Sequence, residues 1–142
     1  MCRSIETNSK IVREHNGRSV TVSNASYKEI AVVQVDGCLI NDSSKRCDWL
    51  FEIPIGKKLV SGVEAVKLVE LKGSNVSKAF AQLESTLGHA AIASIRSLVD
   101  HCFIASKVSP SLNTTVQIEK QRFMQTYGLQ VTVKTKVEFS AG

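Results

Sequence analysis

The sequence predicts an α+β protein in which a mixed central β-sheet is flanked by helices. Two observations lead to this prediction. Several segments alternate apolar and polar residues with a period of two, as strands do, and after Gly73 the spacing changes to the threes and fours of an amphipathic helix. With 142 residues, of which 43% are hydrophobic, the chain is expected to form a single domain over 1–142 with a core of its own.

The first half of the chain is predicted to consist mainly of strands. Residues 1–17 are polar and mixed, and we expect a short helix or a loose arm there. The β-branched run 19–22 and the apolar run 29–36 are separated by turn-forming residues, and we expect them to pair as a hairpin. A strand with two chemically different faces is predicted over 46–53, because apolar and charged residues alternate there.

The second half is predicted to alternate between strands and helices. A strand over 66–73 ends at Gly73, and a helix capped by Ser74 or Asn75 follows it, breaks near Gly88 and His89 and then continues. The remaining predicted elements are a strand over 102–108 ended by Pro110, a helix over 113–127 capped by Asn113 and ended by Gly128, and a strand over 129–139. The predicted order is therefore β-β-β-β-α-β-α-β.

The composition favours some partners and argues against others. Lys and Arg number 18 against 13 Asp and Glu, a net charge of +5 that favours a polyanionic partner such as nucleic acid. No apolar run approaches the roughly 18–20 residues that cross a bilayer, and the first residues lack the apolar centre of a signal peptide, so we expect a cytoplasmic protein. The cysteines are therefore expected to be free thiols, without a zinc site: Cys2, Cys38, Cys47 and Cys102.

Charged residues on two successive predicted strands form the candidate site. Asp48 lies near the start of one strand, and Glu70 and Lys72 lie at the end of the next, so the three side chains could meet at one edge of the sheet if the strands are neighbours. Two carboxylates with the backbone carbonyl of Leu71 make an all-oxygen ligand set suited to Mg²⁺ or Mn²⁺. Lys72 shares the strand face of Glu70, where its ammonium can hold a water molecule and offset negative charge. Such a centre can cleave a phosphodiester bond.

In these residues the chain resembles the PD-(D/E)XK, or restriction-endonuclease-like, nuclease superfamily. The resemblance rests on the aspartate strand 46–51, the Glu-x-Lys strand 69–73 and the helical segment 79–83, and it covers 29–108 best. It implies a restriction-endonuclease-like core with a catalytic set of Asp48, Glu70, Lys72 and Gln82. In that set Asp48 and Glu70 are metal ligands, Lys72 is the catalytic lysine and Gln82 is an auxiliary residue that faces the site.

Some positions depart from the superfamily pattern or leave a choice open. Cys47 stands where many members have proline, and Thr86 stands where some branches have tyrosine. Many members add an acidic residue from an N-terminal helix, for which Glu6 and Glu14 are candidates. Asp36 at the end of the preceding strand is another candidate oxygen ligand, and the sequence does not choose among the three.

The expected function is that of a small Mg²⁺- or Mn²⁺-dependent endonuclease, with DNA favoured over RNA as substrate. The alternative is a non-catalytic module of the same fold that binds nucleic acid or a partner protein, and a purely structural interaction protein is a third hypothesis. Glu70 and Lys72 would then be an ordinary ion pair, worth at most about 1 kcal/mol on an exposed face. A homodimer would contact more of a duplex than so small a chain can contact alone. Trp49 and Phe51 are expected to be core residues rather than base-stacking ones.

Overall fold

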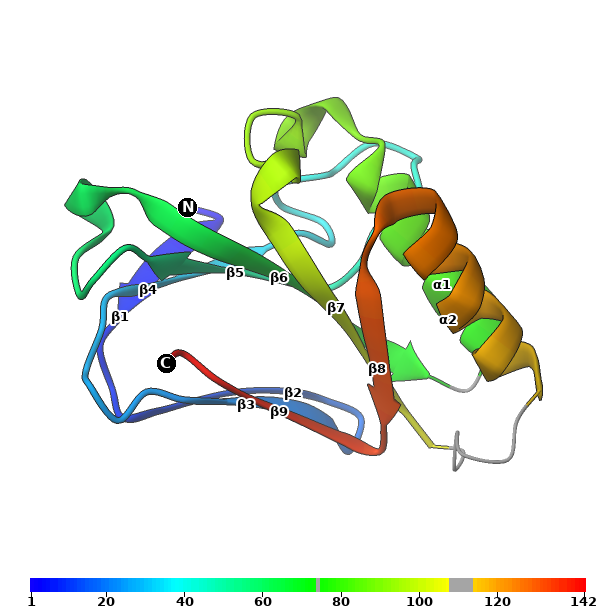
Figure 1. Ribbon diagram of the computed structural model, residues 1–142, viewed down its shortest axis with the longest axis horizontal. Helices are drawn as coiled ribbons and strands as arrows, with labels where there is room; N and C mark the ends of the chain where they lie inside the picture. The colour runs from blue at the N-terminus through cyan, green and yellow to red at the C-terminus, as the bar shows by residue number, and fades with distance from the viewer. Residues whose placement is uncertain (74, 108–113) are drawn as a thin grey trace.

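A computed structural model describes residues 1–73, 75–107 and 114–142, except for the side chain of Lys72. The protein is mixed α+β, as predicted, and is built around a six-stranded sheet of order β1-β4-β5-β6-β7-β8 (Figure 1). Neighbouring strands are antiparallel from β1 to β6 and parallel from β6 to β8. The strands are β1 (Arg3–Glu6), β4 (Ile30–Gln34), β5 (Trp49–Pro54), β6 (Val63–Gly73), β7 (Val99–Ser106) and β8 (Gln130–Lys134).

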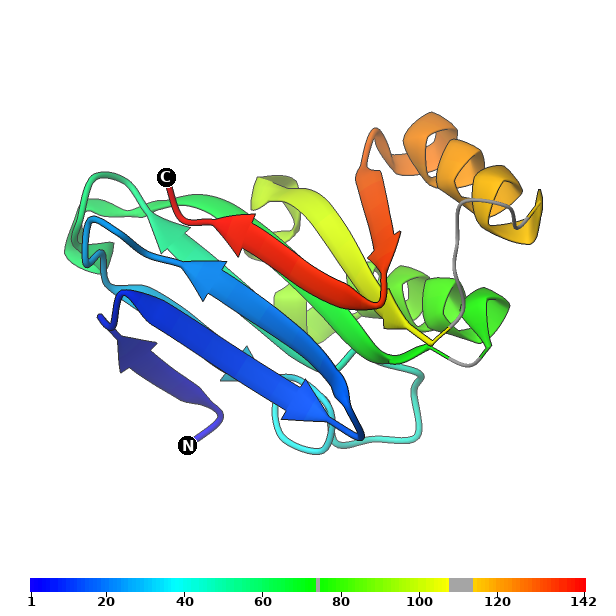
Figure 2. The ribbon, with the colours of Figure 1, turned by 90° about the horizontal axis from the view of Figure 1, so that it is seen from below.

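The central sheet lies between a helical layer and a second sheet (Figures 1 and 2). Helix α1 (Val76–Leu87) follows β6, helix α2 (Thr114–Tyr127) follows β7, and both cover the same face. The opposite face is covered by a three-stranded sheet made of β2 (Lys10–His15), β3 (Arg18–Ser23) and β9 (Lys136–Ser140), with β3 in the middle. The predicted flanking helices therefore occupy one face only.

Side chains that alternate along the central strands produce two hydrophobic cores. Leu50 and Leu68 are fully buried toward the helices, whereas their chain neighbours Phe51 and Val69 are fully buried toward the second sheet. Successive strand residues point to opposite faces, so a strand covered on both sides needs apolar residues at nearly every position. The helical core also contains Phe80, Leu83, Ile104 and Phe123, and the other core contains Ile11, Val22, Phe103 and Val137.

Helix α1 has the predicted cap and the predicted end. Asn75 is the N-cap, and its side chain accepts a hydrogen bond from the Lys78 N–H at 3.0 Å. The helix ends at Gly88, and the short 3₁₀ segments η2 (Ala90–Ile92) and η3 (Arg96–Leu98) replace the predicted continuation. The expected roles of Ser74, Pro110 and Asn113 fall outside the described residues. Within the part of the chain that the structure describes, every helix is too short or too polar to cross a membrane.

Three predictions about this part of the fold were wrong: the first concerns the type of element, and the other two concern which strands pair. Residues 1–17 form β1 and β2 instead of a helix or an arm. The runs 19–22 and 29–36 do contain strands, but β3 and β4 belong to different sheets and do not pair as a hairpin. The predicted strand over 129–139 bends at Thr135, so that β8 completes one sheet and β9 the other. The local pattern identified the strands after residue 17 but did not indicate which strands pair.

Cys2 and Cys38 form a disulfide, so the prediction of free thiols was wrong for this pair. The two residues are 36 positions apart and meet because β1 pairs with β4, which no spacing in the sequence indicates. The prediction is confirmed for Cys47 and Cys102, which are free and buried. The disulfide joins the start of the edge strand β1 to the turn that follows β4.

Reduction of the Cys2–Cys38 disulfide should lower the free energy of unfolding by about 2–4 kcal/mol, because the unfolded chain regains the freedom that the cross-link removes. Urea titrations with and without a dithiol reductant would measure the difference. The variant Cys2→Ser should match the reduced wild-type protein and should not respond to the reductant. Equal stability of the oxidised and reduced wild-type proteins would contradict the prediction.

Candidate active site

Asp48 precedes β5 and is fastened to β6 by two hydrogen bonds. Its backbone N–H donates to the Val69 carbonyl at 3.1 Å, and its Oδ2 accepts from the Leu71 N–H at 2.7 Å. Glu70 lies in the chain between these two points of contact. The antiparallel register, with Trp49 opposite Val69, continues this arrangement along both strands. The fold therefore brings Asp48 next to the Glu70 segment, as the sequence predicted for neighbouring strands.

Glu70 is fully buried near the end of β6. It is expected on the same strand face as Val66 and Leu68, which pack toward the helices. The pairing of β6 with β7 shifts register between Glu70 and Gly73, so Leu71 and Lys72 lie in an irregular stretch of the ladder. Such irregularities are common beside functional sites because they redirect side chains. The backbone of Lys72 belongs to β6, whereas its side chain lies outside the described part of the structure.

Helix α1 fixes the start of β5 through Thr86. The Thr86 hydroxyl accepts a hydrogen bond from the Cys47 N–H and donates one to the Gln82 carbonyl, both at 2.8 Å. Cys47, Gln82 and Thr86 are all buried. Gln82, the predicted auxiliary residue, thus lies one helical turn before Thr86, and its backbone carbonyl accepts from the hydroxyl that binds the Cys47 N–H.

Replacing Thr86 by valine should lower the free energy of unfolding by about 1–3 kcal/mol, because the buried Cys47 N–H would lose its acceptor. Thermal or urea unfolding would measure the change. Thr126→Val removes the same hydroxyl from an exposed position on α2 and should change the free energy of unfolding by less than about 0.5 kcal/mol. Similar small effects from both variants would show that the Thr86 contact contributes little.

A cleft of about 240 Å³ opens beside Asp48 at one end of the two sheets. It is lined by Glu14, His15, Gln34, Asp36, Asp48 and Trp49. Two of the candidate extra ligands, Glu14 and Asp36, therefore line the same cleft as Asp48. Glu14 does so from β2 of the second sheet, not from an N-terminal helix. The third candidate, Glu6, forms an ion pair with Arg13.

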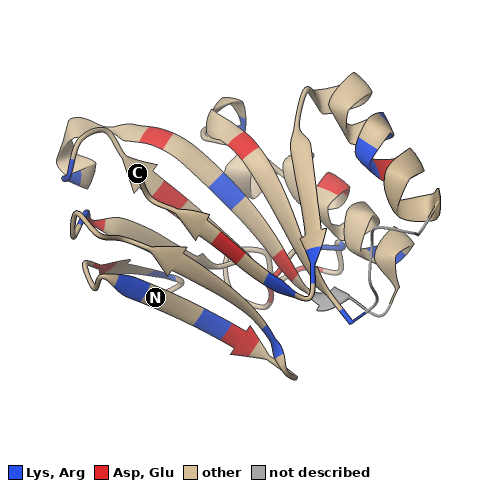
Figure 3. Cartoon of the chain, turned by 60° about the horizontal axis from the view of Figure 1, so that its bottom comes forward, with Lys and Arg blue, Asp and Glu red and all other residues tan. Residues whose placement is uncertain are grey.

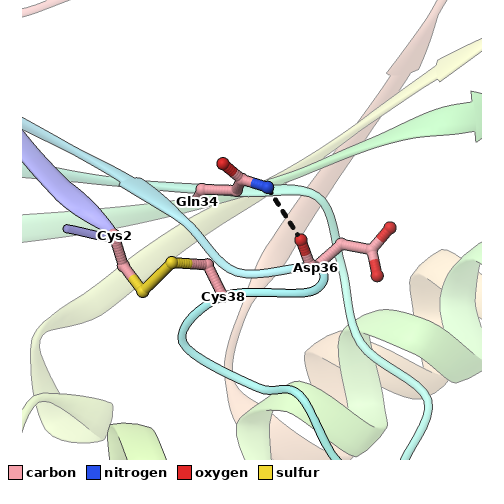
Figure 4. Close-up of a disulfide and its surroundings, with 4 residues drawn as sticks. All are labelled: Cys2, Gln34, Asp36 and Cys38. Atoms are coloured by element: carbon pink, nitrogen blue, oxygen red, sulfur yellow. Dashed lines mark hydrogen bonds between the residues drawn. A yellow bond between two sulfur atoms is a disulfide. The ribbon is translucent and has the colours of Figure 1, made fainter.

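Asp36 is held in position by its neighbours in the turn after β4 (Figure 4). Its Oδ1 accepts a hydrogen bond from Arg46 Nε at 2.8 Å, and its backbone carbonyl accepts one from the Gln34 side chain at 3.1 Å. The Cys2–Cys38 disulfide closes on the same turn. The carboxylate of Asp36 is thus partly neutralised by Arg46, whereas one oxygen of Asp48 accepts from a backbone N–H.

Basic and acidic residues are spread along the strands of both sheets, this end included (Figure 3). The register places Lys136 beside Ser19 and Lys134 beside Ala105, next to the ends of β3 and β7. The Arg13 guanidinium lies 5.1 Å from the centre of the Trp49 ring, a cation–π contact at the wall of the cleft. Phe51 is a core residue as predicted, but Trp49 both packs against the core and borders the cleft.

The thiol beside Asp48 is unsuited to act as a nucleophile. Burial raises the pKa of Cys47 well above its usual value, and the negative charge of Glu70 acts in the same direction. Only the thiolate is an effective nucleophile or metal ligand, so a protonated Cys47 is inert at neutral pH. Any hydrolytic chemistry at this site therefore depends on water and on the charged residues.

The oxygen ligands available at the site fit a magnesium-like cation. Among the described residues, no group of three or more His, Cys, Asp or Glu side chains could hold a metal ion. Mg²⁺ is commonly bound through one or two carboxylates and retains several waters, and Asp48 and Glu70 are oxygen donors of that type. Soft or nitrogen-preferring metals would find no matching ligands in that pair.

The sequence did not reveal the contributions of Thr86, His15 and Arg18 to this region. Thr86 is recognisable only once α1 packs over the start of β5. His15 and Arg18 are directly opposite each other in the β2–β3 pair, and they approach the site only because the second sheet covers the first.

Comparisons with known protein families, with curated proteins and with solved structures find no match to this chain.

Proposed function

We propose that this protein is a metal-dependent nuclease that hydrolyses phosphodiester bonds, with DNA favoured over RNA. The main supporting observation is a pair of hydrogen bonds between Asp48 and β6, which we call the clasp. Asp48 donates its N–H to the Val69 carbonyl and accepts from the Leu71 N–H, so it is bonded to the residues on either side of Glu70. Lys72 follows Glu70 by two residues.

The topology around the clasp supports a restriction-endonuclease-like core. Strands β4, β5 and β6 are consecutive and antiparallel, α1 crosses the sheet, and β7 returns parallel to β6. The aspartate lies at the start of the middle strand of this meander, and the Glu-x-Lys sequence lies at the end of its last strand. This is the order of elements on which the resemblance to the PD-(D/E)XK superfamily depends.

Each proposed site residue would have a separate role in the reaction. Asp48 and Glu70, with the Leu71 carbonyl, would hold Mg²⁺ or Mn²⁺, which when bound stabilises the negative charge that develops during phosphodiester hydrolysis. The Leu71 N–H fixes the Asp48 carboxylate by occupying Oδ2, so Oδ1 keeps a defined direction. The Lys72 ammonium would orient the attacking water and offset charge in the transition state. Gln82 would support the site from α1.

A cleavage assay on supercoiled plasmid and on single-stranded DNA, with Mg²⁺, Mn²⁺ or EDTA, tests this function. Asp48→Ala and Lys72→Ala should each slow metal-dependent cleavage by about 10²-fold or more, because each removes a charge that acts on the reacting phosphate. The matched controls are Asp100→Ala and Lys57→Ala, which remove exposed charges at the opposite end of the sheet. Full activity in Asp48→Ala or Lys72→Ala would refute the assignment.

The rival function, a non-catalytic module that binds nucleic acid or a partner protein, predicts different measurements. A nucleic-acid binder would show an affinity that falls steeply with salt, since Lys and Arg displace counterions from phosphates. It would show no cleavage and no heat of Mg²⁺ or Mn²⁺ binding that depends on Glu70. The net charge of +5 is compatible with either function.

A further inference from the structure

Arg18 is a buried cation at the same end of the molecule as the candidate active site. Its side chain belongs to the first residue of β3, and the residue is only 8% exposed. Among the described residues it enters no ion pair, and its Nε is buried without a hydrogen-bond partner. A buried charge that lacks a partner is costly. A guanidinium in this position is therefore suited to an anionic ligand, and phosphate matches its donor geometry.

The neighbours of Arg18 locate it beside the cleft. Arg18 is opposite His15 in the β2–β3 pair, and cross-strand partners project from the same face of a sheet. That face is the one from which Val20 and Val22 pack toward the central sheet. His15 in turn lines the cleft together with Trp49 and Asp48. Arg18 is thus next to the cleft that Asp48, one of the two carboxylates proposed as metal ligands, lines.

The walls of the cleft suit a flat ring. Trp49 comes from the central sheet and His15 from the second sheet, so aromatic side chains approach from two layers. Unpaired bases stack on Trp and His side chains and on Arg guanidinium planes. The volume of about 240 Å³ is below the range of roughly 300–1,000 Å³ typical of sites for drug-sized ligands. It has room for the base of one nucleotide and not for a larger ligand.

We infer that this cleft binds one unpaired nucleotide of a single-stranded DNA, with its base against Trp49 and His15 and its phosphate on Arg18. An unpaired nucleotide as ligand rests on the nuclease function proposed above, because the same cleft borders Asp48. A base stacked inside a duplex cannot enter such a cleft without being unpaired first. The substrate class is therefore single-stranded DNA, or a duplex with unpaired ends.

Trp49 offers a direct signal for this binding, because it is the only tryptophan in the chain. Titration of the protein with a short single-stranded oligonucleotide in EDTA should quench its fluorescence saturably, with no cleavage to complicate the signal. A blunt duplex of the same sequence should quench at least about tenfold more weakly, since its bases are already stacked. Equal quenching by the duplex, or none by either ligand, would overturn the inference.

Substitutions of Arg18 test the phosphate contact. Arg18→Gln should weaken single-strand binding about tenfold or more and reduce the slope of log affinity against log salt by about 0.7, the value for one phosphate contact on a single strand. Lys57→Gln removes an exposed charge far from the cleft and should leave the affinity nearly unchanged. Arg18→Lys keeps the charge and should retain part of the affinity. Wild-type affinity and salt slope in Arg18→Gln would contradict the role of Arg18.

Failure of this inference can be told apart from failure of the proposed nuclease function. If the protein binds single strands through Trp49 and Arg18 but never cleaves DNA, the nucleotide cleft is supported and the nuclease assignment is refuted. If the Arg18→Gln variant cleaves DNA at the wild-type rate and Trp49 fluorescence does not respond to single strands, only the nucleotide cleft is refuted. Thermal unfolding of each variant would confirm that the binding measurements refer to folded protein.

Discussion

Replacement of Glu70 by glutamine should abolish the heat of Mn²⁺ binding and slow DNA cleavage by about 10²–10⁴-fold. A bound divalent cation contributes several kcal/mol of transition-state stabilisation, and each 1.36 kcal/mol is a factor of ten in rate. Glutamine has nearly the same volume as glutamate, so the fully buried site should keep its packing. The change therefore removes the charge of one proposed metal ligand while it disturbs the surrounding core little.

Glu64→Gln provides the matched control. Glu64 lies on the same strand as Glu70, but it is exposed at the other end of β6. Calorimetric titration with Mn²⁺ and a cleavage time course should give wild-type results for this variant. Unchanged metal binding in Glu70→Gln would contradict the assigned ligand, and equal losses in both variants would point to a general effect of charge.

The parts of the fold that local sequence determines were predicted well. The strands around Asp48 and Glu70 follow a period of two, and α1 has an apolar stripe with Asn75 as its cap. These signals come from residues close in sequence, so they need no knowledge of the rest of the chain. The proximity of Asp48 to Glu70 followed because their strands are consecutive, and consecutive antiparallel strands commonly pair.

The second sheet could not be predicted from local patterns. Strands β3 and β4 have similar β-branched compositions, yet β3 pairs with β2 and with β9 from the other end of the chain. Such pairings depend on which apolar faces are left uncovered once the central sheet has formed. Because β2 and β3 supply His15 and Arg18, the part of the site that they contribute was hidden for the same reason. The disulfide between Cys2 and Cys38 was missed because it, too, joins distant segments.

Replacement of Phe51 by alanine should lower the free energy of unfolding by about 3–5 kcal/mol, a large share of the 5–15 kcal/mol typical of a domain. Phe51 is fully buried between the two sheets, where its ring meets Phe139 of β9 edge-on with the centroids 5.6 Å apart. The loss combines the transfer of apolar surface with the cavity left behind. Tyr27→Ala, at a residue that is 64% exposed, should change stability by less than about 0.5 kcal/mol.

A double-mutant cycle on Phe51 and Phe139 would show whether the second sheet packs as described. Urea unfolding of the two single alanine variants and of the double variant should give a coupling energy of about 0.5–1.5 kcal/mol, the range for aromatic pairs in contact. Additive losses would mean that β9 does not lie against β5 in solution. Since β3 pairs with β9 and carries Arg18, such a result would also remove the structural basis for the nucleotide cleft. A measured coupling would instead support the packing that brings β3 over the central sheet beside Asp48.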